Sequence, residues 1–339
     1  MNSDKSYKSK NLQIEGLRGV AMLLVLCFHY FYTFPHDYVQ GNNPFRILLT
    51  DYWGEIGVCF FLLISGYFMV PKRKVDGISY LISRLKKVWP LYFISITIVF
   101  LLTRLISLPN RTVSLINYLL NIPFINGYIG KPYVDHAHWY LTTLVGAIVV
   151  FSFIINLKPK ARHIFYCVWI IILIGLYYFD SSNSALHLAR SGLYVFLGKD
   201  YSLVIIVGAI IADFDSKTID KYGVIALVLA TIAKLLLGSI SKMIELPLVF
   251  LFFYLCVHSK LNFMNNPIFK WLGRISYPTY LIHQNVGYIF ILLLVESFGK
   301  YSVWMSLVAI PFGLVLGFGL YYIETIIHRL LNNINKNKT

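Results

Sequence analysis

The sequence predicts an all-α, polytopic transmembrane helix bundle of about ten spans with both termini in the cytoplasm. Three observations support this fold class: 58% of the 339 residues are hydrophobic, only 13% are charged, and the charges are clustered. A soluble domain usually carries about a quarter charged residues. The apolar stretches between the clusters approach the roughly 20 residues that a helix needs to cross a bilayer. Solid apolar runs favour helices over a β-barrel, whose strands alternate.

The apolar runs divide the chain into a membrane domain and two short polar tails. We expect a cytoplasmic N-terminal tail at 1–15, a transmembrane domain at 16–326 and a cytoplasmic C-terminal tail at 327–339. The shortest runs, 200–213 and 244–258, leave counts of eight or eleven spans open. The expected spans are 16–34, 53–71, 88–107, 138–157, 164–179, 200–213, 222–238, 244–258, 275–297 and 303–326.

The distribution of Lys and Arg predicts the orientation of these spans. With the N-terminus inside, 21 of the 30 Lys and Arg residues lie on or beside the cytoplasmic side. Cytoplasmic loops of membrane proteins carry an excess of these residues. The formal net charge of +15 is therefore explained by topology and the lipid bilayer, and no nucleic-acid partner is expected.

Neither a disulfide framework nor a metal site is predicted. Asp135, His136 and His138 lie close together before Trp139, but two histidines two residues apart are weak support for metal binding. The cysteines show no CxxC spacing and are interpreted as small hydrophobic residues. Each lies inside an apolar run: Cys27, Cys59, Cys167 and Cys256.

Titratable residues inside membrane spans are energetically expensive and are therefore candidates for function. Arg18 and His29 are eleven residues apart in the first span. This spacing is about three helical turns, so both side chains share one face at a separation of about 16 Å. We expect His29 to act as a catalytic base, because imidazole titrates near neutral pH. A snorkelling Arg18 and a helix-packing His29 are the alternatives.

A second constellation, Arg84-Leu-Lys-Lys87, precedes the third span. Arg84 and Lys87 are three residues apart and share a helix face. With nearby Lys and Arg residues they form a cytoplasmic cationic patch that suits a polyphosphorylated ligand. The alternative is a topological signal that contacts anionic lipid.

A third constellation opens the ninth expected span, with Pro278 in its first turn, where a missing N–H costs little. Ser276, Tyr280 and His283 follow helical spacing, so one stripe carries a hydroxyl, a phenol and an imidazole. Such a stripe serves either catalysis or helix packing. Glu324, near the inner end of the last span, is expected either to orient a histidine or to pair with a cytoplasmic Arg.

Taken together, these segments resemble the membrane-bound acyltransferase-3 family. The order of motifs is similar along nearly the whole chain, although the second segment has one extra spacing residue and Lys87 stands where the family has Arg. Lys cannot form the bidentate phosphate contact of Arg. The matching segments are Arg18 to His29, Phe60-Phe61-Leu-Leu-Ile-Ser65-Gly66, Arg84 to Lys87, Trp139-Tyr-Leu, Gly273 to His283 and Tyr321-Tyr-Ile-Glu324.

The resemblance implies an integral membrane O-acyltransferase of a bacterial plasma membrane. It implies that an acyl group, usually acetyl, moves from cytoplasmic acetyl-CoA to a hydroxyl of a cell-surface polysaccharide, lipid-linked sugar or other glycan. Some relatives carry a fused extracytoplasmic domain that finishes the transfer. This chain shows none, so it either modifies its acceptor itself or passes the acyl group to a separate extracytoplasmic transferase.

The resemblance also suggests roles for the candidate residues. Arg18, Arg84 and Lys87 would bind the phosphates of CoA. His29 would take the proton of the acceptor hydroxyl or carry the acyl group itself, and Ser276 or Tyr280 would stabilise the oxyanion. A transporter or flippase of a polar glycan or small metabolite is the alternative function, and a sensor or structural membrane component is a third.

Overall fold

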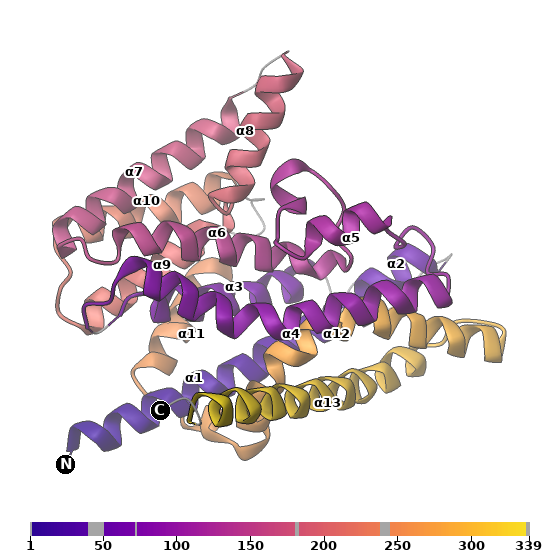
Figure 1. Ribbon diagram of the computed structural model, residues 1–339. Helices are drawn as coiled ribbons and strands as arrows, with labels where there is room; N and C mark the ends of the chain where they lie inside the picture. Colours follow the sequence, from indigo (N-terminus) through magenta and orange to yellow (C-terminus); the bar gives the residue numbers. More distant parts are fainter. Residues whose placement is uncertain (1, 40–50, 72, 180–182, 238–244, 337–339) are drawn as a thin grey trace.

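The computed structural model describes residues 2–39, 51–71, 73–179, 183–237 and 245–336. Within these residues every regular element is a helix, as predicted. Figure 1 shows the long helices lying side by side, with α8 projecting from them. The longer helices are α1 (Asn2–Cys27), α3 (Asp51–Met69), α4 (Gly77–Leu105), α6 (Trp139–Ile154), α7 (Pro159–Tyr178), α8 (Ser184–Phe196), α9 (Tyr201–Asp215), α10 (Lys221–Leu237), α11 (Glu245–Val257), α12 (Pro267–Phe298) and α13 (Val303–Lys336).

Short helices connect the long ones. The chain between α4 and α6 contains three of them, and α8 lies between α7 and α9. The short elements are the π-helix η1 (Phe28–Thr33), α2 (Phe34–Tyr38), α5 (Leu115–Asn121), and the 3₁₀ helices η3 (Asn126–Ile129), η4 (His136–His138) and η6 (Asn262–Asn265).

All ten predicted apolar segments contain helix. Eight stretches of the described residues are long and apolar enough to cross a membrane, and one of them joins α8 and α9. The other two predicted spans form α10, with 17 residues, and α11, with 13 described residues. The multi-pass character is thus confirmed, while the count of ten and the orientation remain predictions.

The outer surface of the bundle suits lipid rather than water. Large apolar side chains face outward along several helices, among them Leu105 at 80% exposure, Phe153 at 79% and Val315 at 69%. Exposed apolar surface of this extent marks contact with a membrane or partner.

Side-chain capping sets where several helices begin. Asp76, Ser114, Asn183 and Asn266 each accept a hydrogen bond from a backbone N–H in the first turn that follows. Such caps satisfy N–H groups that have no partner within the helix. The cap at Asn266 starts α12 at Pro267, earlier than expected.

The predicted start of the ninth span is therefore wrong. Pro278 lies inside α12 and not in its first turn. The Asn266-Pro267 pair provides a stronger start, because Asn caps a helix and Pro fits its first position. An internal Pro is tolerated in membrane helices when neighbouring helices satisfy the freed backbone group.

Helix α12 packs against α1, α4 and α13. Its closest approach to α1 depends on glycine. A Cβ atom at Gly273 would lie 2.0 Å from the carbonyl oxygen of Glu15, and one at Gly19 would lie 2.2 Å from that of Phe269. Small residues allow membrane helices to approach this closely. On the other side α3 packs against α9, and α9 and α10 pack together with α7.

Helix α1 does not keep α-helical geometry throughout. From Phe28 to Thr33 it widens into the π-helix η1, which contains His29. Short π-helical stretches inside α-helices are rare and frequently occur at functional sites.

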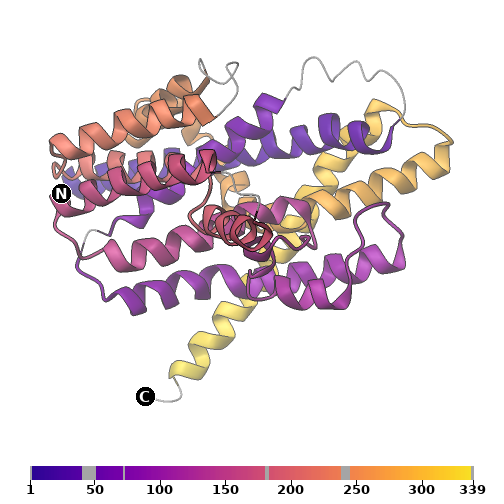
Figure 2. The same cartoon turned by 90° about the horizontal axis from the view of Figure 1, so that it is seen from above.

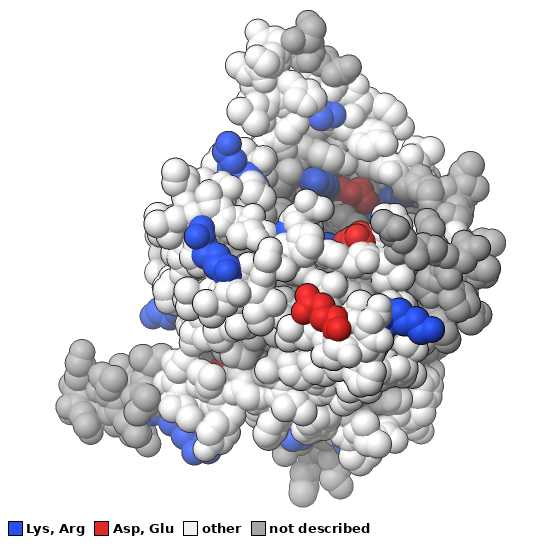
Figure 3. Space-filling model, turned by 90° about the vertical axis from the view of Figure 1, so that its right-hand side faces the viewer, with Lys and Arg blue, Asp and Glu red and all other residues white. Residues whose placement is uncertain are grey.

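The two ends of the bundle differ. We call the end where α1 begins and toward which α13 runs the basic end (Figures 1 and 2). The opposite end carries the 106–135 connection and is called the loop end. Figure 3 looks onto the loop end and shows basic and acidic side chains together in a hollow of a mostly uncharged surface.

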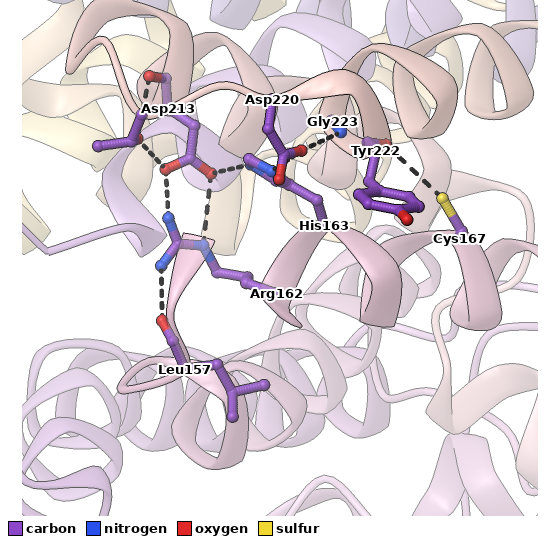
Figure 4. A network of polar contacts seen from close by, with 9 residues as sticks. Leu157, Arg162, His163, Cys167, Asp213, Asp220, Tyr222 and Gly223 are labelled. Atoms are coloured by element: carbon purple, nitrogen blue, oxygen red, sulfur yellow. Dashed lines mark hydrogen bonds and ion pairs between the residues drawn. The ribbon is translucent and has the colours of Figure 1, made fainter. Parts of the chain in front are cut away.

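A network of charges ties α7, α9 and α10 together (Figure 4). The Asp213 carboxylate lies between Arg162 and His163, which follow each other at the start of α7. The other ring nitrogen of His163 lies 2.8 Å from Asp220 Oδ1, just before α10. Thr218 Oγ1 also donates to Asp213, at 3.0 Å.

Candidate active site

A cavity of about 470 Å³ lies among α1, α3, α4, α6, α12 and α13, and we call it the polar cavity. All the motif segments that the sequence analysis singled out contribute to its wall, although they are spread over the whole chain. The polar lining residues are Glu15, Arg18, Ser65, Arg84, Lys87, Tyr140, Arg274, Ser276, Tyr277, Tyr280 and Glu324.

A second cavity of about 820 Å³ lies beside the polar cavity toward the basic end, and we call it the mouth. The two cavities share Glu15, Arg18, Phe68, Arg84, Lys87 and Arg274. Lys270 lines only the mouth. Five cationic side chains therefore surround a continuous space that leads into the bundle: Arg18, Arg84, Lys87, Lys270 and Arg274.

The predicted cationic residues are held in different ways. Arg18 pairs with Glu15 at 3.7 Å, and its guanidinium lies 5.7 Å from the centre of the Phe68 ring. Arg84 donates to the Phe68 carbonyl oxygen and stacks on Tyr80 at 5.0 Å. Lys87 is exposed and lines both cavities. The structure thus brings Arg18, Arg84 and Lys87 to one wall, as expected of a shared anion site.

Sequence analysis missed two cations of this site. Lys270 and Arg274 are four residues apart on α12 and reach the same mouth. The spacing was a usable signal, because residues four apart share a helix face. Their place on this helix was missed because the ninth span was expected to begin at 275, after both residues.

The hydroxyl groups at the inner part of the cavity are already engaged within the protein. Ser276 Oγ donates to the Gly273 carbonyl oxygen at 2.7 Å, and Tyr280 donates to the carbonyl oxygen of Ala137. Ser65 Oγ and Tyr140 OH lie 3.1 Å apart. Glu324 of α13 lines the same cavity.

His29 and His283 form a pair beyond Tyr280 and do not line the polar cavity. Their ring centres are 5.0 Å apart, and the His283 ring lies 5.8 Å from that of Tyr280. Tyr280 in turn lies 5.5 Å from Tyr140. A contiguous row of rings therefore connects the cavity wall to His29, with Tyr280 and His283 between them.

The hydrogen bonds of His29 determine which of its nitrogens carries the lone pair. Gln284 Nε2 lies 3.1 Å from His29 Nδ1, while Gln284 Oε1 accepts the Ala137 N–H at 2.7 Å. An amide nitrogen can only donate, so Nδ1 of the neutral His29 ring accepts. Tyr288 OH lies 3.4 Å from the same nitrogen.

His283 has the opposite arrangement. Its Nδ1 lies 2.8 Å from the Tyr280 carbonyl oxygen, which can only accept, so Nδ1 carries the proton of the neutral ring. Its Nε2 is buried and has no partner among the described residues, and the side chain is 0% exposed. An unpaired basic nitrogen thus lies beside His29.

The segment before α6 holds this arrangement in place. Asp135 accepts the Asn285 and Ala137 N–H groups, each at 3.0 Å, and His138 Nε2 lies 3.0 Å from the Leu281 carbonyl oxygen. In the described part of the chain no three His, Cys, Asp or Glu residues lie close enough to hold a metal. Asp135 and His138 therefore dock the loop onto α12.

These observations define a class of protein: a multi-pass membrane helix bundle in which a basic cavity approaches a buried histidine pair. The family model described as an acyltransferase domain matches residues 11–323. The chain belongs to this acyltransferase-3 family and is a membrane acyltransferase. Comparisons with curated proteins and with solved structures found no match.

Proposed function

We propose that this membrane acyltransferase moves an acetyl group from acetyl-CoA to a hydroxyl of a cell-surface polysaccharide or lipid-linked sugar. The observation that carries the proposal is the mouth with its five cations, which continues into the polar cavity toward the histidine pair. The 3′-phosphate and diphosphate of CoA suit such a site, since Arg and Lys form strong charge-assisted hydrogen bonds with phosphate.

We place the donor with its phosphates among Arg84, Lys87 and Arg274 and its thioester toward Tyr280. The mouth would then face the cytoplasm of a bacterial cell, in agreement with the predicted orientation. The thioester has to pass the Tyr280 ring to reach His29, so a movement of this side chain belongs to the proposed cycle.

In the reaction, the acceptor hydroxyl displaces the Gln284 amide from His29 Nδ1 and gives this nitrogen its proton, and the hydroxyl oxygen attacks the thioester carbonyl carbon. The C–O bond forms, the C–S bond breaks, and the CoA thiolate takes the proton back from His29. His283 stabilises the His29 imidazolium by offering its unpaired Nε2 to the neighbouring ring. An acyl-His29 intermediate, followed by transfer to the acceptor or to a separate transferase protein, is the two-step variant.

The donor site is tested with detergent-purified protein and labelled acetyl-CoA. Each of Arg84→Ala, Lys87→Ala and Arg274→Ala should raise the KM for acetyl-CoA about tenfold, because each loses a charge-assisted phosphate contact. Lys87→Arg should be neutral or better. Lys86→Ala is the matched control, since Lys86 is the exposed neighbour of Lys87 and lines neither cavity.

Calorimetric CoA binding that is unchanged in the Arg84→Ala/Lys87→Ala double variant would refute the donor site. A wild-type protein that neither hydrolyses acetyl-CoA nor transfers from it in detergent would refute the enzymatic function, because only a transporter requires a closed vesicle.

The orientation is tested separately: cysteines introduced at Lys160 and Lys217 should react only after permeabilisation, and one at Lys131 in intact cells.

A further inference from the structure

Arg111, in the connection between α4 and α5, is a buried cation outside the cavities. Its side chain is 6% exposed, and Nη2 donates to Asp37 Oδ2 at 2.7 Å. Nη1 is buried and has no hydrogen-bond partner within the described residues. Since buried polar groups in proteins are nearly always paired, an unpaired guanidinium nitrogen requires an explanation.

Arg111 contacts Tyr288, a neighbour of His29, which is the proposed catalytic base. The guanidinium carbon lies 5.3 Å from the centre of the Tyr288 ring, and the Tyr288 hydroxyl is 3.4 Å from His29 Nδ1. Nδ1 is the nitrogen that accepts in the neutral His29 ring. Through Tyr288, Arg111 is therefore connected to the Nδ1 side of His29.

This side belongs to the loop end, opposite the mouth. Asp37 comes from α2, and Arg111 comes from the chain that follows α4. Tyr38, whose hydroxyl donates to the Pro109 carbonyl oxygen at 3.0 Å, also faces the guanidinium. Two separate segments thus hold the guanidinium, with its unpaired Nη1, against Tyr288.

We propose that Arg111 forms an acceptor subsite, in which Nη1 donates a hydrogen bond to a sugar oxygen adjacent to the reacting hydroxyl. This inference deepens the proposed acyl transfer and rests on it. Asp37 already neutralises the Arg111 charge, so the subsite suits a neutral, hydroxyl-bearing sugar rather than a carboxylate or phosphate. An uncompensated cation would favour an anion instead.

Arg104 shows how a purely structural arginine looks in the same part of the molecule. It is exposed, stacks on Phe100 at 4.6 Å and donates to the Val113 carbonyl oxygen at 3.2 Å. This backbone contact fastens the same connection that contains Arg111. Arg104 is therefore the matched control.

The test uses purified full-length protein, acetyl-CoA and methyl β-D-glucopyranoside as the neutral sugar probe. Arg111→Gln should raise the KM for the glucoside about 10- to 100-fold, as loss of a hydrogen bond to a charged donor does. The KM for acetyl-CoA should not change. Arg104→Gln should leave both values as in the wild type. An unchanged glucoside KM in Arg111→Gln, or an equal rise in both KM values, overturns the proposal.

Arg111→Gln also leaves the Asp37 carboxylate without its ion-pair partner. The Asp37→Asn/Arg111→Gln double variant controls for this effect, because it removes both charges. It should bind the glucoside as weakly as Arg111→Gln even if that single variant is unstable. Asp37→Asn alone should shift the preference toward methyl β-D-glucuronide, whose carboxylate replaces the missing counter-charge. The proposal is wrong if Asp37→Asn leaves the ratio of the two KM values unchanged.

Direct binding separates this inference from the proposed function. Calorimetry with the glucoside in the absence of CoA should show binding that depends on Arg111 and not on Arg104. Arg111-dependent binding by a protein without acetyl transfer would refute the transfer and keep the subsite. Normal acetyl transfer by Arg111→Gln would refute the subsite and keep the proposed transfer.

Discussion

Two buried polar clusters in this bundle differ in how completely their atoms are paired. In the network of α7, α9 and α10, all three nitrogens of Arg162 and both of His163 have partners, and both Asp213 oxygens accept (Figure 4). In the cluster around His29, the Nε2 of His283 and the Nη1 of Arg111 have no partner within the described residues.

The comparison distinguishes a cluster that holds helices together from one that is prepared for a ligand. A fully paired ionic network leaves nothing for a substrate, and breaking it leaves a buried charge uncompensated. A cluster with unpaired donors and acceptors next to a histidine is incomplete until another molecule supplies the partners. Charge and burial alone would not separate the two.

The largest expected effect is on the transfer rate, and it distinguishes His29 from His163 of the paired network. His29→Gln should lower transfer about 10²- to 10⁴-fold, because Gln cannot take up the proton. Its thermal midpoint should stay near that of the wild type. His163→Gln should do the opposite, with a lower midpoint and a near-normal kcat in the protein that remains folded. Assays of initial rate and of thermal unfolding in detergent measure both.

His283→Ala sharpens this test. If it abolishes transfer while His29→Gln does not, His283 rather than His29 is the base. If both variants lose transfer and keep CoA binding, the pair acts as described.

A second prediction concerns stability in the paired network. Asp213→Ala should destabilise the fold by about 3–5 kcal/mol, the usual effect of removing one member of a buried ion pair. Arg162 and His163 would both lose their shared partner. Replacing Arg162 and Asp213 together, as Arg162→Met/Asp213→Leu, should restore much of the loss. A double variant no more stable than Asp213→Ala would contradict this account.

A third prediction concerns the close approach of α1 and α12. Gly273→Ala should cost about 1–3 kcal/mol, since the new methyl group would meet the Glu15 backbone. It should also weaken CoA binding, because Glu15, Arg18 and Arg274 line the same mouth. Gly175→Ala is the control: a Cβ there meets nothing within 4 Å, so the change should be neutral or stabilising by about 1 kcal/mol.

The smallest expected effect is a pH dependence at the edge of the paired network. Burial of the Asp220 carboxyl opposes its ionisation, but hydrogen bonds from the Gly223 N–H and His163 outweigh it and lower the pKa of Asp220. A depressed pKa in the folded state stabilises the fold above the unfolded value of about 3.9, and this stabilisation is lost as the pH falls further. The thermal midpoint of the wild type should therefore fall more steeply below about pH 4 than that of Asp220→Asn. Equal slopes would show that Asp220 does not contribute.

The fold class and the lining of the polar cavity were largely predictable from the sequence, because both depend on local patterns. Apolar runs gave the helices, and Arg18, Arg84, Lys87, Ser276 and Tyr280 meet at one cavity as the motifs implied. The start of α12 was mispredicted, since the apolar run begins later than the Asn266 cap. Lys270 and Arg274 were missed for the same reason.

The contacts around His29 and Arg111 could not be predicted, because they join segments that lie far apart in the chain. Arg111 looks like an ordinary loop arginine until α2 and α12 bring Asp37 and Tyr288 to it. Gln284 is one polar residue in an apolar helix until its amide meets His29. No local spacing signals either contact.

The π-helix that contains His29 makes this part of the chain sensitive to how its backbone winds. Most of the bundle tolerates exchange of one apolar residue for another of similar volume. If the same residues from Phe28 to Thr33 wound as a regular α-helix, the residues that follow would instead be turned by about 100°. Asp37 would then point away from Arg111 although every side chain was unchanged. In this stretch, the winding of the backbone specifies the site as much as the identity of the residues does.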